Sequence, residues 1–187
     1  MKIQVDPMKT NFPMPAVLIS CQKEEMLDII AISWITMVSQ NPCSLLVSFL
    51  KTRFSLSIIQ KTMRFAVNVP QVIDWEKLNF CGIYSGRDRD KFKEMNLTPF
   101  YSNHDSQTPM IKECPINILC DTVNLIDYED RILVLGKVSE VYIDEDITQD
   151  NQKIGIEKTK PFIYWMSGGE YWNIGSKVGS VKKVYNE

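Results

Sequence analysis

The sequence predicts a mainly β protein, a barrel or sandwich with a few short helices in its connections. Most apolar segments are short, rich in β-branched or aromatic residues, and separated by turn residues, as strands are. Helical spacing is rare along the chain. Residues 116–143 contain two long β-prone runs with no helix between them, where a doubly wound α/β fold would need one.

The predicted strands include one long hairpin. Its two runs flank Asp127-Tyr128-Glu129-Asp130, four mostly polar residues that are typical of a turn. We expect this hairpin to form the backbone of the sheet. The predicted strands are residues 16–21, 44–50, 65–69, 116–126, 132–143 and 162–166.

The clearest helix is predicted over residues 53–63, because its apolar residues recur every three to four positions. Either Thr52 or Ser55 is expected to cap its start, since a hydroxyl there accepts a hydrogen bond from a free backbone N–H. Shorter helices are predicted over residues 74–80 and 89–95.

Length and composition indicate one globular domain spanning residues 1–187, with 44% hydrophobic and 24% charged residues. Lys plus Arg number 21 and Asp plus Glu 23, a net charge of −2, which argues against nucleic acid as the partner. The longest apolar runs, 45–50 and 132–135, are far shorter than the roughly 20 residues of a membrane-spanning helix. No membrane partner is therefore expected.

The five cysteines are odd in number and form no Cys-x-x-Cys, and charge and proline interrupt the N-terminus before a signal-peptide core forms. We therefore expect reduced thiols and a cytoplasmic location. The thiols are predicted to be structural, with Cys81 as the one whose pKa nearby cations could lower. The single histidine, His104, has no second ligand at zinc spacing, so no metal site is predicted.

Common catalytic and nucleotide-binding motifs are missing. The eight glycines form neither Gly-x-Gly-x-x-Gly nor a P-loop, and no Gly-x-Ser-x-Gly occurs. A lone loop histidine also disfavours a Ser-His-Asp or Cys-His nucleophile. No catalytic residue is predicted.

Three segments nevertheless suit a phosphate and a flat ring. In residues 31–36, hydroxyls and backbone N–H groups can bind the edge of a heterocycle beside Trp34, although Trp34 as a core anchor remains an alternative. Residues 48–55 place two cations and two hydroxyls at a helix N-terminus, an anion site by hydrogen bonding and dipole. The alternative is a capped helix with exposed basic residues.

The third segment, residues 81–92, offers Arg87 and Lys91 to grip a phosphate, with Gly86 permitting a close backbone approach. The alternative is a turn whose charges, alternating in sign from residue 87 to 91, pair with one another.

The order of these segments resembles the flavin reductase-like, flavoredoxin-type family of FMN-binding split β-barrels. The most specific motif is Phe80-Cys81-Gly82-x-x-Ser85-Gly86-Arg87-Asp88-x-Asp90-Lys91-Phe92. Further matches are Phe12-Pro13-Met14-Pro15, Ser33-Trp34, Asn41-Pro42, Phe65-Ala66-Val67-Asn68-Val69-Pro70, Glu113-Cys114-Pro115 and Gly168-Gly169-x-Tyr171. The chain departs from the family in having no glycine across residues 22–28 and in having Met37 near Trp34.

The resemblance implies a Greek-key split barrel, a homodimer with one FMN per subunit, and an oxidoreductase that passes electrons from NAD(P)H or a redox partner through the flavin. The alternatives are a non-catalytic FMN-binding protein, such as a flavin sensor or store, and a plain interaction domain. The cofactor-binding residues so implied are Ala31, Ile32, Ser33, Trp34, Ser48, Phe49, Leu50, Lys51, Thr52, Arg53, Ser55, Ser85, Gly86, Arg87 and Lys91.

Overall fold

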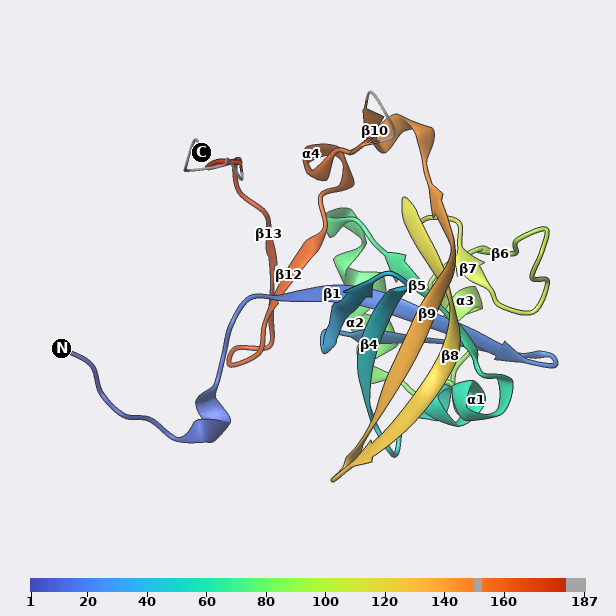
Figure 1. Cartoon of the computed structure of the whole chain (residues 1–187), viewed down its shortest axis with the longest axis horizontal. Coiled ribbons are helices and arrows are strands. Elements are labelled where there is room, and N and C mark those ends of the chain that lie inside the picture. Colours follow the sequence, from blue (N-terminus) through green and yellow to red (C-terminus); the bar gives the residue numbers. More distant parts are fainter. Residues whose placement is uncertain (150–152, 181–187) are drawn as a thin grey trace.

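A computed structural model describes residues 1–149 and 153–180, and in it the chain is built around one long antiparallel sheet (Figure 1). Its hydrogen-bonded order is β13-β12-β1-β5-β8-β9-β4-β3, with β2 pairing β1 off this path. The strands are β1 (Met14–Lys23), β2 (Met26–Ile32), β3 (Ile35–Gln40), β4 (Cys43–Leu50), β5 (Arg64–Val69), β8 (Ile116–Tyr128), β9 (Arg131–Ile143), β12 (Phe162–Trp165) and β13 (Glu170–Asn173).

The helices are short and lie in the connections. They are α1 (Phe54–Thr62), α2 (Trp75–Ile83), α3 (Lys91–Glu94) and α4 (Ile156–Thr159), with single 3₁₀ turns at Pro7–Lys9, Val72–Asp74 and Glu145–Ile147. Two small ladders lie outside the main sheet, β6 (Pro99–Phe100) with β7 (Met110–Ile111) and β10 (Thr148–Gln149) with β11 (Lys153–Ile154).

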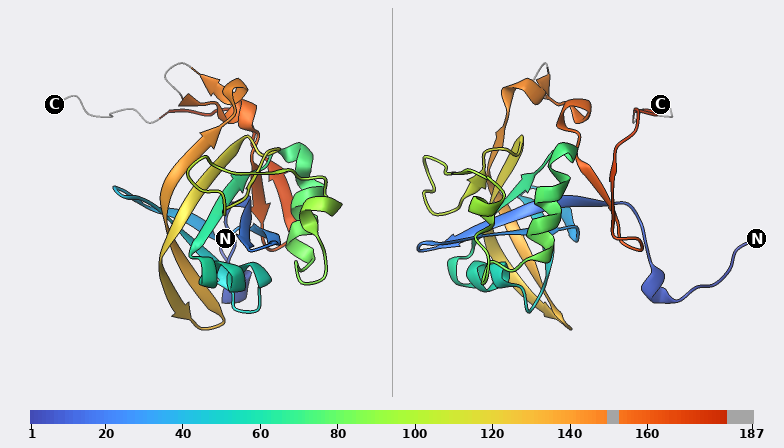
Figure 2. Two further views of the ribbon diagram at one scale, coloured as in Figure 1. Left: turned by 90° about the vertical axis from the view of Figure 1, so that its right-hand side faces the viewer. Right: turned by 180° about the vertical axis from the view of Figure 1, so that it is seen from behind.

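Strand β1 is buried on both faces, which ties together two hydrophobic cores. Alternate side chains point to opposite faces of a strand, so Val17, Ile19 and Cys21 enter the barrel interior with Phe49, Phe65 and part of α1. Ala16 and Leu18 point the other way, into a second core with Leu78, Cys81 and Phe92. Helices α2 and α3 therefore cover the outside of β1 and β2 (Figure 2).

The predicted mainly β architecture, the six strands and the long hairpin are confirmed. The hairpin turn is tighter than expected, because Tyr128 pairs with Arg131 and leaves only Glu129 and Asp130 unpaired. Strands β2, β3 and β13 were not predicted; in β2 the buried Asp28 interrupts the apolar pattern that sequence reasoning relies on.

The predicted cap of α1 is wrong. The N-cap position belongs to Arg53, in extended conformation, and no side chain caps the helix. Ser55 instead donates its hydroxyl hydrogen to Asp28. The first-turn N–H groups of α1 are therefore free of any side-chain acceptor, which leaves them available to another one.

The turn between β1 and β2 is made without glycine. Lys23 pairs with Met26, so Glu24 and Glu25 form a two-residue turn, and Glu24 adopts the left-handed region at φ 54°. The missing glycine in this hairpin therefore changes the chemistry of the turn but leaves the path of β2 into Ala31 intact.

Among the residues that the structure describes, no helix is both long and apolar enough to cross a membrane.

Candidate functional site

The start of α1 opens into a small cavity of about 110 Å³, here called the α1 pocket. Its wall comes from four places in the chain: strand β2, the β4–α1 junction, the turn that follows α2, and the start of α3. The lining residues are Asp28, Ile30, Thr52, Arg53, Phe54, Ser55, Tyr84, Ser85, Gly86, Arg87 and Lys91. The second and third predicted segments are thus brought together, although about thirty residues separate them in the chain.

Two guanidinium groups line the α1 pocket. Arg87 donates from Nη1 to the Thr52 carbonyl at 3.3 Å and lies over the Phe54 ring, 5.2 Å from its centroid. Arg53 occupies the N-cap position itself. Arginines and uncapped N–H groups at a helix N-terminus together favour a bound anion.

The alternative interpretation of the third segment was a turn in which the charges of residues 87–91 pair with one another. The structure shows a different arrangement. Arg89 instead makes a bidentate ion pair with Glu94 and lies over the rings of Phe80 and Tyr84. Hydrogen bonding to Arg89 holds the pKa of the Glu94 carboxyl below its usual value. Arg89 is thereby engaged away from the α1 pocket, whereas Arg87 faces it.

A second cavity of about 380 Å³ adjoins the α1 pocket and is here called the Trp34 cavity. Arg53 lines both. The other lining residues are Ala16, Ala31, Ile32, Ser33, Trp34, Ser48, Leu50, Asn79, Gly82, Ile83, Arg131, Tyr164, Met166, Gly169 and Tyr171. The 31–34 segment and the start of the 48–55 segment therefore meet here, as predicted.

Arg131 is a member of the Trp34 cavity that sequence reasoning missed. Its guanidinium carbon lies 3.7 Å from the centroid of the Trp34 ring, and Nη1 is 3.4 Å from both the carbonyl and the hydroxyl oxygen of Ser48. Burial lowers its pKa, and the like charge of Arg53 adds to this effect. Because Arg131 follows the hairpin turn directly, its sequence position indicates a turn residue rather than a site residue.

No acidic side chain lines the Trp34 cavity among the described residues, and Arg53 and Arg131 both reach it. Trp34 is 41% exposed, so it serves as a cavity wall and not as the core anchor of the alternative interpretation. A ligand here meets the Trp34 indole and two tyrosines, two serine hydroxyls and two cations.

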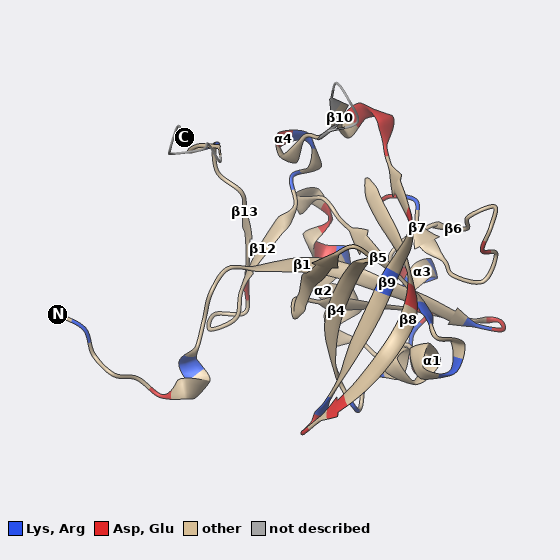
Figure 3. Cartoon of the chain, viewed as in Figure 1, with Lys and Arg blue, Asp and Glu red and all other residues tan. Residues whose placement is uncertain are grey.

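Two of the predicted binding residues point elsewhere. Phe49 is fully buried in the barrel interior, because its side chain takes the inward position of β4. Lys51 reaches the long hairpin, where its Nζ lies 2.7 Å from Asp127. Figure 3 shows basic and acidic segments close together at the tip of this hairpin. Neither side chain lines the α1 pocket or the Trp34 cavity.

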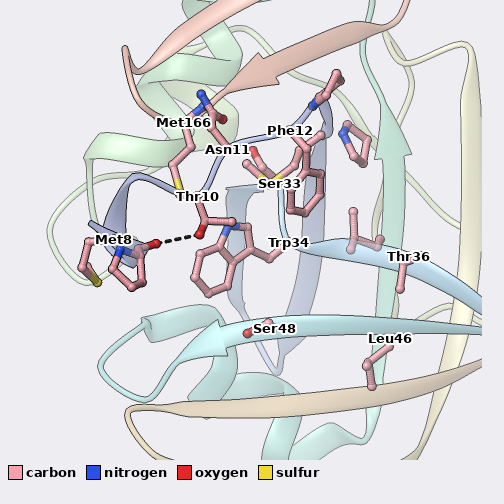
Figure 4. A pocket seen from close by; sticks show the side chains of 15 residues that line it. Met8, Thr10, Asn11, Phe12, Ser33, Trp34, Thr36, Leu46, Ser48 and Met166 are labelled. Atoms are coloured by element: carbon pink, nitrogen blue, oxygen red, sulfur yellow. Dashed lines mark hydrogen bonds between the residues drawn. The ribbon is translucent and has the colours of Figure 1, made fainter. Parts of the chain in front are cut away.

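A third, larger cavity lies on the other side of Trp34 and measures about 840 Å³. Residues 7, 8 and 10–15 form one wall of this N-terminal chamber, and residues 33–36, Leu46, Ser48 and Met166 form the rest (Figure 4). No charged side chain lines it among the described residues. Asn11 holds the N-terminal wall in place, since its amide donates to Ser167 and its oxygen accepts from the Met166 N–H.

All five cysteines are free thiols, and four are buried. Burial raises the pKa of Cys81 to about 12, which outweighs the lowering effect of Lys91. This agrees with the prediction that Cys81 is a structural thiol, and the pKa-lowering effect that nearby cations could have had does not prevail. Burial also raises the pKa values of Cys21, Cys114 and Cys120. No described group of three or more side chains could hold a metal ion.

Residues 8–172 match the family model described as the flavin reductase like domain. A flavin reductase from Pseudomonas putida is 30% identical over 118 residues, which are 62% of this chain and 64% of that protein. Flavoredoxin from Methanosarcina acetivorans is 27% identical and superposes with a TM-score of 0.90 over 98% of this chain and 97% of that one. A putative flavin reductase with a split barrel domain from Shewanella frigidimarina shares the fold, at 19% identity and a TM-score of 0.81 over 92% and 87%.

Proposed function

The chain belongs to the flavin reductase-like family, and on this premise we propose that it is an FMN-binding oxidoreductase that passes electrons from NAD(P)H or a redox partner through the flavin. The observation that carries the proposal is the α1 pocket. There an uncapped helix N-terminus, Arg53 and Arg87 converge at the edge of a cavity walled by Trp34.

The residues of the α1 pocket fit the phosphate of FMN. Its two arginines can make charge-assisted hydrogen bonds to phosphate oxygens, and the hydroxyls of Thr52 and Ser85 can add neutral ones. The N–H groups of the first turn of α1 have no side-chain acceptor, so they can contribute to the same site. Phosphate binding needs no glycine-rich loop in this arrangement.

The Trp34 cavity fits the rest of the cofactor. Ser48 and Leu50 line the part next to Arg53, where we place the ribityl chain, and Trp34 with Ala31 borders the part that would hold the isoalloxazine. Gly82 brings α2 close to this wall, since a Cβ there would lie 3.3 Å from the Ala31 Cβ.

When bound, FMN supplies a ring that accepts a hydride or electrons and passes them on, and the protein binds and orients it. This division of labour agrees with a site that contains arginines, hydroxyls and an indole but no histidine and no reactive thiol among its lining residues. Arg131 and Trp34 would limit access of water to one side of the cavity, since they stack on each other.

The test is an anaerobic titration of the purified protein with NADH and with NADPH, followed by flavin absorbance. A yellow protein that either nucleotide bleaches supports the reductase. A yellow protein that neither nucleotide bleaches, yet a redox partner or dithionite does, favours an electron carrier or the alternative of a flavin sensor or store. A protein that binds no FMN would overturn the proposal and leave an interaction domain.

We further propose that the working form is a homodimer in the cytoplasm. Of the aromatic residues near the C-terminus, Phe162, Tyr164 and Tyr171 serve the second core. Trp165 and Trp172 remain exposed at 36% and 58%, and large aromatic residues are enriched at interfaces. Light scattering at micromolar concentration should give the mass of two chains; a flavin-loaded monomer would contradict this.

A further inference from the structure

A buried ion pair lies behind the α1 pocket. Asp28 and Lys91 have side chains only 1% and 2% exposed, and Lys91 Nζ lies 2.9 Å from Asp28 Oδ1. Lys91 also donates to the Ile29 carbonyl, and Ser55 donates to Asp28 Oδ2. Burying two charges is costly unless they are paired and hydrogen-bonded, so this pair is a feature that the fold maintains against a penalty.

Asp28 connects the separate walls of the α1 pocket. Its carboxylate accepts from Ser55 in the first turn of α1 and contacts Lys91 at the start of α3. It also lies against Gly86, where a Cβ would come within 2.2 Å of Asp28 Oδ1. The turn that carries Ser85 and Arg87 is therefore seated directly on this carboxylate. Any side chain at residue 86 would push that turn away.

The same carboxylate is an electrostatic problem for an anion site. Asp28 is the one acidic side chain that lines the α1 pocket among the described residues. An unpaired carboxylate at this place would repel a phosphate and lower the affinity for it, because like charges that lie close together in an interface are unfavourable. Oδ1 accepts no hydrogen bond from any described residue, so its ion pair with Lys91 is what neutralises it.

We propose that Lys91 acts on phosphate binding through Asp28, as a positioning residue that neutralises the carboxylate and fixes the Gly86 turn, rather than as a ligand of the phosphate. This role differs from the expectation that Lys91 grips the phosphate directly. It rests on the proposed function, because the phosphate in question is that of FMN. Lys91 Nζ is already engaged, since it forms the ion pair with Asp28 Oδ1 and donates a hydrogen bond to the Ile29 carbonyl.

A double-mutant cycle separates the two roles. We would measure FMN and riboflavin affinities by fluorescence quenching, in an alkaline buffer that favours ionised carboxylates, for Lys91→Met, Asp28→Asn and the double variant. Lys91→Met should weaken FMN binding by about tenfold or more and leave riboflavin, which lacks the phosphate, nearly unchanged. Asp28→Asn removes the charge at nearly constant size, and its FMN affinity is the reference for the double variant.

The double variant decides the question. If Lys91 acts through Asp28, removing the carboxylate as well should restore FMN affinity to within about threefold of Asp28→Asn. A double variant as weak as Lys91→Met would show a direct ligand and overturn the proposal. Equal losses for FMN and riboflavin in Lys91→Met would also overturn it, because a merely structural pair would affect both.

Two controls keep the cycle interpretable. Lys93→Met removes the same charge from the exposed side of α3 and should change neither affinity. If Lys91→Met does not fold, Lys91→Gln takes its place in the same cycle. A wild-type protein that binds neither flavin would refute the proposed function instead. The flavin affinities of the wild type are therefore measured before those of any variant.

Discussion

The α1 pocket and the N-terminal chamber both adjoin the Trp34 cavity, the first through Arg53 and the second through Trp34, and they differ in size and in charge. The α1 pocket is small, about 110 Å³, and contains two arginines and a buried ion pair. The N-terminal chamber is about 840 Å³ and has no charged lining residue among those described. The protein thus separates a small, charged end from a roomy, apolar one.

This difference indicates which end supplies affinity and which leaves room for another molecule. Charge-assisted hydrogen bonds in a small preformed pocket fix one group strongly. An apolar chamber with one wall made by the N-terminal segment offers area without a fixed polar contact. Variants at the charged end should therefore discriminate FMN from riboflavin, whereas variants at the Trp34 wall should not.

The largest expected effect concerns whether the cations of the charged end activate a nearby thiol. Cys81 lies behind the α1 pocket, and burial raises the pKa of its thiol from 9.0 to about 12 despite Lys91. Since the thiolate is the nucleophile, iodoacetamide at mildly alkaline pH should label Cys81 roughly a thousandfold more slowly than an ordinary thiol. Peptide mapping after a short pulse measures this, with the less buried Cys43 as the internal reference.

The raised pKa of Cys81 also makes the stability of the folded protein depend on pH. Ionising Cys81 is harder in the folded than in the unfolded chain, so its contribution to stability is present below about pH 9 and is lost as pH rises toward about 12. Rapid labelling of the folded protein at Cys81 would show that the cations do activate this thiol. The influence of the charged end would then extend to Cys81.

The second effect tests the charged end directly. Arg53→Ala should weaken FMN binding by about 1.5–3 kcal/mol if Arg53 makes a charge-assisted hydrogen bond to the phosphate. Riboflavin should bind the variant and the wild type alike. Lys51→Ala is the matched control, because Lys51 pairs with Asp127 outside the cavities and its loss should leave both affinities unchanged. Unaltered FMN affinity in Arg53→Ala would remove Arg53 from the site.

A third effect tests whether the charged end is tightly built. Gly86→Ala should lower the free energy of unfolding by about 1–3 kcal/mol, because the added Cβ would meet Asp28 Oδ1 at 2.2 Å. Gly175→Ala is the control, since nothing lies within 4 Å of its added Cβ. Urea unfolding measures both. A Gly86→Ala variant as stable as the control would mean that the turn can shift freely.

The smallest effect lies on the wall between the two ends. Trp34→Ala should weaken FMN and riboflavin equally, by about 1 kcal/mol, because an aromatic face contacts the ring system and not the phosphate. Fluorescence quenching by both flavins measures this. A loss confined to FMN would place Trp34 at the charged end and contradict the division between the two regions.

Much of this organisation could be predicted from local sequence. The long hairpin, the amphipathic helix after residue 53 and the run Ser85-Gly86-Arg87 are features of contiguous residues, so their patterns indicate them. Strand β2 was not predicted, because Asp28 breaks its apolar pattern. The charge of Asp28 can be buried because it pairs with Lys91, which lies 63 residues further along the chain. Arg131 was missed for a related reason, since only the pairing of β9 with β4 brings it to Trp34 and Ser48.

Local sequence was enough to predict the mainly β class, six of the strands of the main sheet, the helices α1, α2 and α3, and the clustering of hydroxyls and cations in residues 48–55 and 85–91. Those follow from periodicity and residue chemistry, which are local. Only the tertiary structure decided which of these side chains face a cavity. Within one run, Arg53 lines the α1 pocket, Phe49 fills the barrel and Lys51 pairs with the hairpin. The physical reason is that the direction of a side chain depends on the elements packed around it. A charged residue that the sequence predicts to be exposed can be buried when a partner distant in the chain neutralises it.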